Sequence, residues 1–449
     1  MDPQRARSAQ SDSLHEALDS GTTTHLRGLV QDLHPAEIAD VLEALPPAQR
    51  KIVWELIDPE NEGEVLVALN EEVRATLIQE MDPEELVAAA AGLELDDLAD
   101  LSAELPETIN REVLKTLDQD DRRRLEAILS YDEDSAGGLM DPDTLTVRQD
   151  VTIAVVFRYL RMRGEIPEGT DAIFVVSQQG EYEGCLLITA MLTADPEQKI
   201  SAVMDTQSRA IEANTPAAEV ALIFERHDLV SAAVVDQTGL LLGRITIDDV
   251  VDVIRHEADH SVLSMAGLDE DDDMFAPVFV STRRRSIWLG VNLATAFVAA
   301  GVASLFEATL ERVVMLAILM PVVPSMGGIA GSQTLILITR GIALGQIDSS
   351  NARWLLSKEF GIGLLNGLTW ACVVAGITMW WFQTWRIAVV IAIALAINLI
   401  CAAVAGFTIP LTLKKLKIDP ALAGGVVLTT ITDVVGLGAF LGFGALLLL

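Results

Sequence analysis

An aspartate lies inside an otherwise apolar segment near the C-terminus. The segment reads TTITDVVGLGAFLGFG from Thr429, and its acidic residue is Asp433. A carboxylate at mid-membrane depth costs several kcal/mol, so it normally faces a cavity, a partner or an ion. No lysine or arginine lies at a matching depth in the sequence. We therefore expect Asp433 to face a cation rather than a salt-bridge partner.

A second polar stretch, PVVPSMGGIAGSQ from Pro321, interrupts another apolar segment. Its two prolines remove helix hydrogen bonds, and its glycines allow unusual backbone angles. In a membrane, irregular backbone survives only where it is buried in protein or lines a wet cavity. The alternative is a proline kink in a packed helix. Polar neighbours favour a pore lining: Ser325, Ser332, Gln333 and Thr334.

The ligands that these segments offer are nearly all oxygen atoms. Carboxylate, hydroxyl and amide groups are present without histidine, and the cysteines Cys372 and Cys401 are isolated. Such a set favours hard cations, namely Mg²⁺, Ca²⁺ or Mn²⁺, over zinc or copper. Because Mg²⁺ releases its water reluctantly, a site with few carboxylates would hold it through its hydration shell. Composition alone leaves the choice among the three ions open.

A purely structural role for Asp433 is the alternative to a cation site. Its carboxylate would then bond to the nearby threonines Thr429, Thr430 or Thr432 and join helices. The GxxxG pair Gly438 and Gly442 would let this helix approach another one closely. In a homodimer, two copies of Asp433 would face one axis.

The chain divides into two halves of different charge, and the second half contains Asp433 and the other polar groups described above. Residues 1–280 hold 59 of the 65 acidic and 20 of the 31 basic residues, a net charge of −39, whereas residues 281–449 have a net charge of +5. The opening RARSAQSDS is polar and no short apolar signal segment follows Met1, so we expect the acidic half to stay in the cytoplasm.

Five apolar runs in the second half are long enough to cross a membrane. They cover about 286–306, 313–338, 360–382, 387–413 and 421–448. Basic residues gather before the first run, after the second and after the fourth, and this predicts that those loops are cytoplasmic. The opposite loops carry only Arg312 and Arg386. With five spans, the C-terminus would lie outside the cell.

The acidic half has two patterns. Residues 34–130 repeat short amphipathic helices opened by HPAE or DPEE, in which an N-cap, a proline and acidic residues suit a helix start. Their recurrence predicts a small helical solenoid.

Residues 141–260 twice show helix, strand, glycine turn, strand and helix, which resembles a tandem pair of CBS modules. Such pairs often bind adenine nucleotides. The stretch TIDD resembles the ribose-contacting end of that site, so Thr246 and Asp248 are candidate ATP contacts.

Together these motifs resemble the MgtE magnesium channel family. The resemblance rests on HPAEIADVLEALP, SYDEDSAGGLM, GGIAGSQ followed by TRGIALG, and IDPALA followed by TTITDV. It implies a multidomain homodimer with an all-α helical solenoid, an α+β CBS pair, a connecting (plug) helix and a five-span α-helical transmembrane domain. The expected parts are a polar tail 1–25, the N domain 26–138, CBS modules 139–202 and 203–260, a plug helix 261–284 and a pore domain 285–449.

The resemblance also implies roles for individual residues. Asp433 matches the family's pore aspartate and would bind Mg²⁺. The implied pore-lining residues are Gly328, Gly331, Gln333, Gly425, Thr429 and Thr430. The implied regulatory metal ligands, which would close the pore at high internal Mg²⁺, are Asp96, Asp97, Asp100, Asp249, Asp252 and Glu257. Two departures stand out: Ile329 replaces the family's usual asparagine, and GGV at 424–426 replaces SGP.

Other classes of function remain open on the sequence. A secondary transporter coupled to sodium or protons would use Asp433 as an ion-binding or titrating group. A non-conducting sensor would need the acidic domains but no wet pore. Walker A, DKTG and HExxH motifs are absent from the sequence, so we expect neither an enzyme nor an ATP-driven pump. The expected setting is the inner membrane, with lipid and a divalent cation as partners and no nucleic acid.

Overall fold

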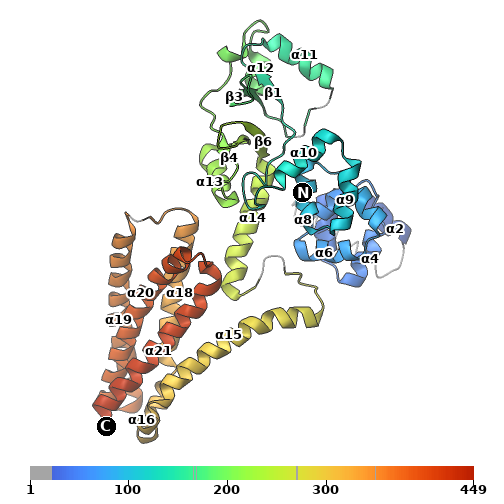
Figure 1. Ribbon diagram of the computed structural model, residues 1–449. Helices are drawn as coiled ribbons and strands as arrows, with labels where there is room; N and C mark the ends of the chain where they lie inside the picture. Colours follow the sequence, from blue (N-terminus) through green and yellow to red (C-terminus); the bar gives the residue numbers. More distant parts are fainter. Residues whose placement is uncertain (1–22, 165, 168, 269–271, 349) are drawn as a thin grey trace. The chain divides into compact units, whose positions relative to one another are not determined.

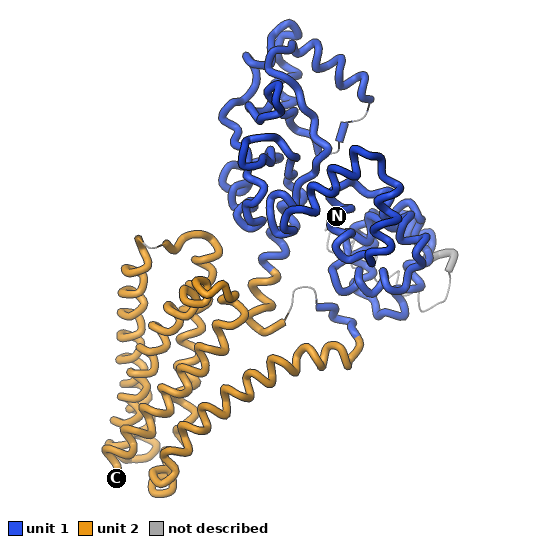
Figure 2. The backbone as a smooth tube through the Cα atoms, viewed as in Figure 1, with its two compact units in different colours: residues 1–258, 271–276 blue, residues 259–270, 277–449 orange. Residues whose placement is uncertain are grey.

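The computed structural model describes residues 23–164, 166–167, 169–268, 272–348 and 350–449. Most of the predicted tail 1–25 lies outside the described residues. The chain divides into two compact units (Figure 2). Unit 1 is Met1–Ala258 with Asp271–Ala276, and unit 2 is Asp259–Glu270 with Pro277–Leu449.

Short helices build the N-terminal part of unit 1, as predicted (Figure 1). They are α2 (Thr23–Gln31), α3 (Pro35–Glu43), α4 (Pro47–Trp54), α5 (Glu62–Ala68), α6 (Glu71–Glu80), α7 (Pro83–Ala90), α8 (Leu95–Glu104), α9 (Glu107–Thr116) and α10 (Gln119–Ile128). The expected caps are present, since His34 and Asp82 each form a capping box with the glutamate three residues later. These caps satisfy N–H groups that the helix itself leaves free.

Two similar α+β modules follow, which confirms the predicted repeat. The first holds β1 (Thr146–Arg148), α11 (Ile153–Arg163), β2 (Ala172–Val176), β3 (Tyr182–Leu187) and α12 (Ile188–Thr193). The second holds β4 (Ile211–Glu212), α13 (Ala217–His227), β5 (Ser231–Val235), β6 (Leu241–Thr246) and α14 (Ile247–Leu263). Each sheet joins its first strand in parallel and its third strand antiparallel to the middle strand.

A shared apolar core joins the helical domain to the second module. Buried residues from α3, α8 and α10 belong to the same cluster as Val220, Phe224 and Val250 of the second module. The first module has a separate core. Because protein cores are closely packed, a shared core keeps the start of α14 in a fixed place beside the helical domain.

The single plug helix predicted over 261–284 is not formed. Helix α14 ends at Leu263, and a short 3-10 turn, η2 (Ser264–Ala266), follows it. Gly267 then takes a positive φ of 72°, a conformation that ends helices. The next helix, α15 (Val278–Ser304), begins only after Pro277. The sequence segment has helix character, but the glycine and the proline separate two helices.

Unit 2 contains five helices long and apolar enough to cross a membrane, counted among the described residues. They are α15, the broken pair α17 (Val314–Leu319) and α18 (Val322–Ala343), then α19 (Ala352–Phe382), α20 (Trp385–Lys415) and α21 (Pro420–Leu448), with the short α16 (Glu307–Arg312) between the first and second spans. The five predicted spans are confirmed. Helix α20 packs against α18, α19 and α21.

The irregular backbone of the second span is confined to one place. The break lies at Met320 and Pro321, between α17 and α18. The glycines that follow are helical, because α18 runs through them without a positive φ. Their small size serves close packing instead: a Cβ on Gly327 or Gly331 would collide with side chains of α20 or α21. The expectation of unusual angles at these glycines is therefore corrected.

Candidate functional site

Asp433 lies in the middle of α21 without a protein partner. Its side chain is half-buried, and it makes no hydrogen bond or ion pair with the described residues. The nearby hydroxyls are used elsewhere. Thr429 donates to the carbonyl of Gly425 at 3.0 Å, and Thr430 donates to that of Val426 at 2.7 Å. The helix-joining alternative, in which threonines bind Asp433, is therefore not what the chain forms.

The expected pore-lining residues fall into two groups. Gln333 is exposed on α18, Gly328 and Gly425 face open space, and the two threonines are half-buried on α21. Gly331 differs from them, because it is buried and a Cβ there would lie 2.8 Å from Leu428. Gly331 therefore lies where α18 packs against α21, and it does not line an open space. The substituted Ile329 is 58% exposed, so its side chain is not part of the core of this chain.

A buried glutamate on α19 escaped the sequence analysis. Glu359 lies in the early turns of α19, and it is only 3% exposed. The hydroxyl of Thr334 on α18 donates to its Oε2 at 3.2 Å, and Nζ of Lys358 lies 4.0 Å from its Oε1. The sequence gives no signal for this link, because it depends on how α18 and α19 pack. Glu359 therefore joins two spans near the predicted cytoplasmic side.

Three of the expected regulatory ligands lie together on α8. Burial raises the pKa of Asp97 to about 7, and the charges of Asp96 and Asp100 add to the rise. The pKa of Asp100 is also raised to about 7, by burial and by the charge of Glu133. Burial and the neighbouring Asp141 likewise raise the pKa of Asp96. Carboxylates held this close repel one another, and a divalent cation would relieve that repulsion.

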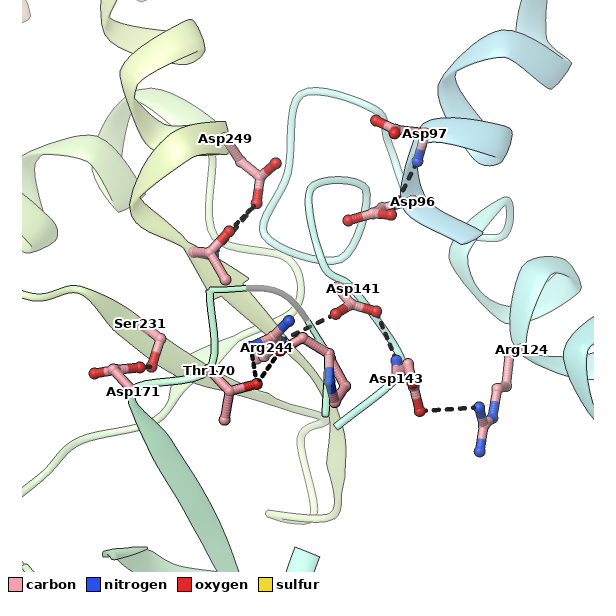
Figure 3. Close-up of polar contacts among 12 residues, drawn as sticks. Asp96, Asp97, Arg124, Asp141, Asp143, Thr170, Asp171, Ser231, Arg244 and Asp249 are labelled. Atoms are coloured by element: carbon pink, nitrogen blue, oxygen red, sulfur yellow. Dashed lines mark hydrogen bonds and ion pairs between the residues drawn. The ribbon is translucent and has the colours of Figure 1, made fainter. Parts of the chain in front are cut away.

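Asp249 extends this group from the first turn of α14. Its Oδ2 accepts hydrogen bonds from the backbone N–H of Thr246 at 3.3 Å and from the hydroxyl of Thr246 at 3.0 Å. Burial, together with the charge of Asp96, raises the pKa of Asp249 to about 7. Figure 3 shows Asp249 in the same view as Asp96 and Asp97. We name the four residues Asp96, Asp97, Asp100 and Asp249 the acidic cluster.

The remaining two expected ligands lie further along α14 than Asp249. Asp252 and Glu257 are exposed on the later turns of α14. The structure instead brings two residues that the sequence had not suggested, Glu94 and Asp141, whose carboxylate oxygens and those of Asp96 lie within 4.8 Å of one another. Asp141 is, however, already paired with Arg244 at 3.0 Å, and both side chains are buried (Figure 3). We therefore regard Asp141 as a structural residue.

An ion pair within unit 1 holds the segment that precedes the first span. Arg50 of α4 makes two bonds to the carboxylate of Asp273, at 2.6 and 2.7 Å. The two side chains are 2% and 5% exposed. The backbone N–H of Asp273 also donates to Glu72 at 2.6 Å. The helical domain thus binds the chain at Asp273, a few residues before α15 begins. The sequence does not indicate this contact.

The two candidate nucleotide contacts differ in availability. Thr246 is 7% exposed, and its hydroxyl serves the cap of α14. Asp248 is exposed and makes no hydrogen bond or ion pair with the described residues. Of the pair, Asp248 is free to meet a ligand.

Comparison with known proteins gives the same division of the chain. A family model described as a divalent cation transporter, MgtE, matches residues 320–443, a model of the MgtE intracellular N domain matches 33–134, and a CBS domain model matches 200–256. A magnesium transporter MgtE of Thermus thermophilus is 32% identical, covering 97% of this chain and 98% of the relative. One from Bacillus subtilis is 26% identical, with coverage of 95% and 94%.

A solved structure also matches about half of the chain. It is the cytosolic domain of the Mg²⁺ channel MgtE in complex with ATP, which is 33% identical and has a TM-score of 0.49. The match covers 54% of this chain and 99% of that one.

Proposed function

The chain belongs to the MgtE family of magnesium transporters, and we propose that it is a Mg²⁺-selective channel. The observation that carries this proposal is the unpartnered carboxylate of Asp433 in the middle of a spanning helix. A carboxylate so placed is stable only beside water or a cation. One carboxylate per chain suits an ion that keeps its own water shell, and Mg²⁺ is the divalent ion that dehydrates most reluctantly.

The channel is proposed to be a homodimer with the path on its axis. Three apolar side chains, Ile247, Val251 and Ile254, follow one face of α14 at helical spacing and are 40–53% exposed. An apolar stripe in water is normally covered by a partner. A second copy of the chain supplies such a partner and brings a second Asp433 to the same path. The basic loops support a cytoplasmic position for unit 1 and a position outside the inner membrane for the C-terminus.

The acidic cluster is proposed to sense internal Mg²⁺ and to close the channel. Without a cation, its carboxylates resist being held together, as their raised pKa values indicate. Mg²⁺ would stabilise the close arrangement of α8 and α14. Two routes lead from there toward the membrane unit: α14 itself, which ends in unit 2, and the segment held by Asp273 just before α15.

Flux into proteoliposomes tests the pore. Wild type, Asp433→Ala and a control, Glu311→Ala, would be compared for Mg²⁺, Ca²⁺ and Mn²⁺ without sodium or proton gradients. Glu311 is an exposed carboxylate of the same unit, so its removal should leave flux unchanged. We expect Asp433→Ala to lose about 100-fold in Mg²⁺ flux, because the described helix α21 carries no other acidic residue. Flux that appears only under a sodium or proton gradient would instead identify a coupled transporter.

ATP is proposed as a ligand of the CBS pair, because Asp248 is exposed and unpaired beside the cap of α14. Titration calorimetry on the full-length protein would test it. We expect Asp248→Ala to weaken ATP binding, whereas Asp143→Ala, a change in the first module, should not. Equal affinities for wild type and Asp248→Ala would remove Asp248 from the site.

A further inference from the structure

An asparagine is fully buried in the apolar interior of unit 2. Asn398 of α20 is 0% exposed, and its Nδ2 donates to the backbone carbonyl of Val323 on α18 at 2.8 Å. Its Oδ1 is buried and has no hydrogen-bond partner among the described residues. An unpaired buried oxygen costs free energy that a leucine of similar size would avoid. Packing alone therefore does not account for an asparagine at this position.

The amide occupies a gap that two glycines on two other helices leave open. A Cβ on Gly327 of α18 would lie 2.2 Å from Nδ2 of Asn398, and one on Gly436 of α21 would lie 2.8 Å from the same atom. Both distances are far below van der Waals contact. The side chain of Asn398 thus sets how closely α18 and α21 approach α20.

This junction lies beside the turn of α21 that carries Asp433. Gly436 follows Asp433 by three residues, so the two positions are about 4.5 Å apart along the helix axis and about 60° apart around it. A helix turns as a nearly rigid body at this scale. Any shift or rotation of α21 at Gly436 therefore moves the carboxylate of Asp433 by a similar amount.

The hydrogen bond of Asn398 reaches the first turn of α18. Val323 lies in the first turn of that helix, immediately after the break at Pro321. The first turn of a helix has the fewest internal hydrogen bonds to hold it. The bond from Nδ2 therefore anchors the start of α18 to α20 at the same place where α21 is held.

We propose that Asn398 is a positioning residue for the cation path. It fixes the start of α18 and the rotation of α21 together, and through α21 it fixes the position of Asp433. This inference rests on the proposed function of Asp433. Because misplacement by about 1 Å can cost about 100-fold in rate, we expect its loss to reduce flux even where the fold is intact.

Asn398→Leu is the principal test, because it keeps the branched heavy-atom skeleton of the side chain and removes the hydrogen bond. Flux of Mg²⁺ and Ca²⁺ would be measured in proteoliposomes at equal amounts of folded full-length protein, beside the melting temperature. We expect Mg²⁺ flux to fall about tenfold and the Mg²⁺ to Ca²⁺ flux ratio to change, with no loss of melting temperature. Unchanged flux and ratio would overturn the proposal, because a residue needed only for packing would leave both intact.

A second pair of variants separates crowding from positioning. Gly436→Ala should destabilise the protein by collision with Asn398, and Asn398→Ala in the same chain should make room for the added methyl group. We expect the double variant to recover its melting temperature but not its flux. Recovery of both would contradict a role for the hydrogen bond. Gly438→Ala is the matched control, since its Cβ would meet nothing closer than 3.9 Å.

The same experiments distinguish failure of this inference from failure of the proposed function. If Asp433→Ala abolishes flux while Asn398→Leu leaves it unchanged, only the positioning role of Asn398 is wrong. If Asp433→Ala leaves Mg²⁺ flux unchanged, the proposed site itself fails and the inference fails with it.

Discussion

The two units hold acidic side chains in opposite ways. In unit 1, the acidic cluster crowds several carboxylates together, and burial with mutual repulsion raises the pKa of three of them to about 7. In unit 2, Asp433 has no charged neighbour on its helix and no partner among the described residues. The first arrangement shares its charge among several groups, whereas the second depends on one.

This difference indicates two kinds of response to a cation. A shared site loses only part of its affinity when one carboxylate is removed, and its affinity follows the number of charges present. A lone carboxylate has no substitute, so its position decides whether it works. In the function that we propose, unit 1 would therefore give graded sensing, and Asp433 of unit 2 would give an all-or-none step in permeation.

The largest expected effect is a loss of folding stability when Asp273, a carboxylate of unit 1, loses its ion-pair partner Arg50. Arg50→Ala would leave Asp273 buried and unpaired, which we expect to cost about 3–5 kcal/mol in the free energy of unfolding. Guanidinium denaturation of the full-length protein measures it in the transition of the helical domain. Arg111→Ala is the control, because its pair with Glu107 is exposed and should be worth less than about 0.5 kcal/mol.

The same variant tests the link to the membrane unit. If the segment at Asp273 transmits closing, Arg50→Ala should raise the internal Mg²⁺ concentration needed for half-closing while leaving flux without internal Mg²⁺ unchanged. A stability loss with unaltered closing would restrict Asp273 to a structural role.

A smaller effect is expected from thinning the acidic cluster. The double variant Asp97→Asn with Asp249→Asn removes two of its charges, and we expect the half-closing Mg²⁺ concentration to rise about tenfold. Either single change should give less. Patch recordings with varied cytoplasmic Mg²⁺ measure the shift. Asp143→Asn is the control, because Asp143 is an acidic residue already paired with Arg163; an equal shift there would indicate a general charge effect.

The smallest predicted effect is a dependence on pH. Protons and Mg²⁺ would compete for the carboxylates of the acidic cluster. Because the pKa values of Asp97 and Asp249 are about 7, this competition would occur at physiological pH. As pH falls from about 7.5 to 6.5, we expect the half-closing Mg²⁺ concentration to rise about threefold, if one proton leaves per ion bound. The double variant should lose this dependence. A dependence that survives in it would place the titrating group elsewhere.

Without Mg²⁺, the thermal stability of the protein should depend on pH through the carboxylates of the acidic cluster. Their pKa values are raised above the usual aspartate value of 3.8, so their favourable contribution is complete below about pH 4 and is lost as pH rises through about 7. We expect the melting temperature in chelator to fall over this range and to recover when Mg²⁺ is added. A melting temperature that rises between pH 5 and 7.5 in chelator would contradict this assignment.

Local patterns predicted most of the fold. The five spans, the capped helices at His34 and Asp82 and the repeated strand order were all confirmed. Each depends on residues that are close in sequence: the length of an apolar run, a proline after an N-cap, or a glycine turn. The bounds 261–284 predicted for the plug helix do not match one helix, because a glycine at 267 and a proline at 277 separate α14 from α15.

The candidate sites were predictable only in part. Asp433 was evident, since a charge inside an apolar run needs no tertiary information. The ion pairs of Asp141 and Asp273 were not, because their partners lie 103 and 223 residues away. Nor could the sequence separate Gly331, which packs against Leu428, from Gly328, which faces open space. Which face of a helix is covered depends on its neighbours.

The sequence by itself determined that this protein has an acidic domain, a CBS pair and five spans with one mid-membrane carboxylate. Those features depend on amino-acid composition and on the spacing of residues that are close together in the sequence. The tertiary structure alone decided which carboxylates are paired and which remain available to a cation. It also decided that Asn398 meets Gly327 and Gly436 beside Asp433, because contacts between distant segments arise from packing, which the order of residues does not display.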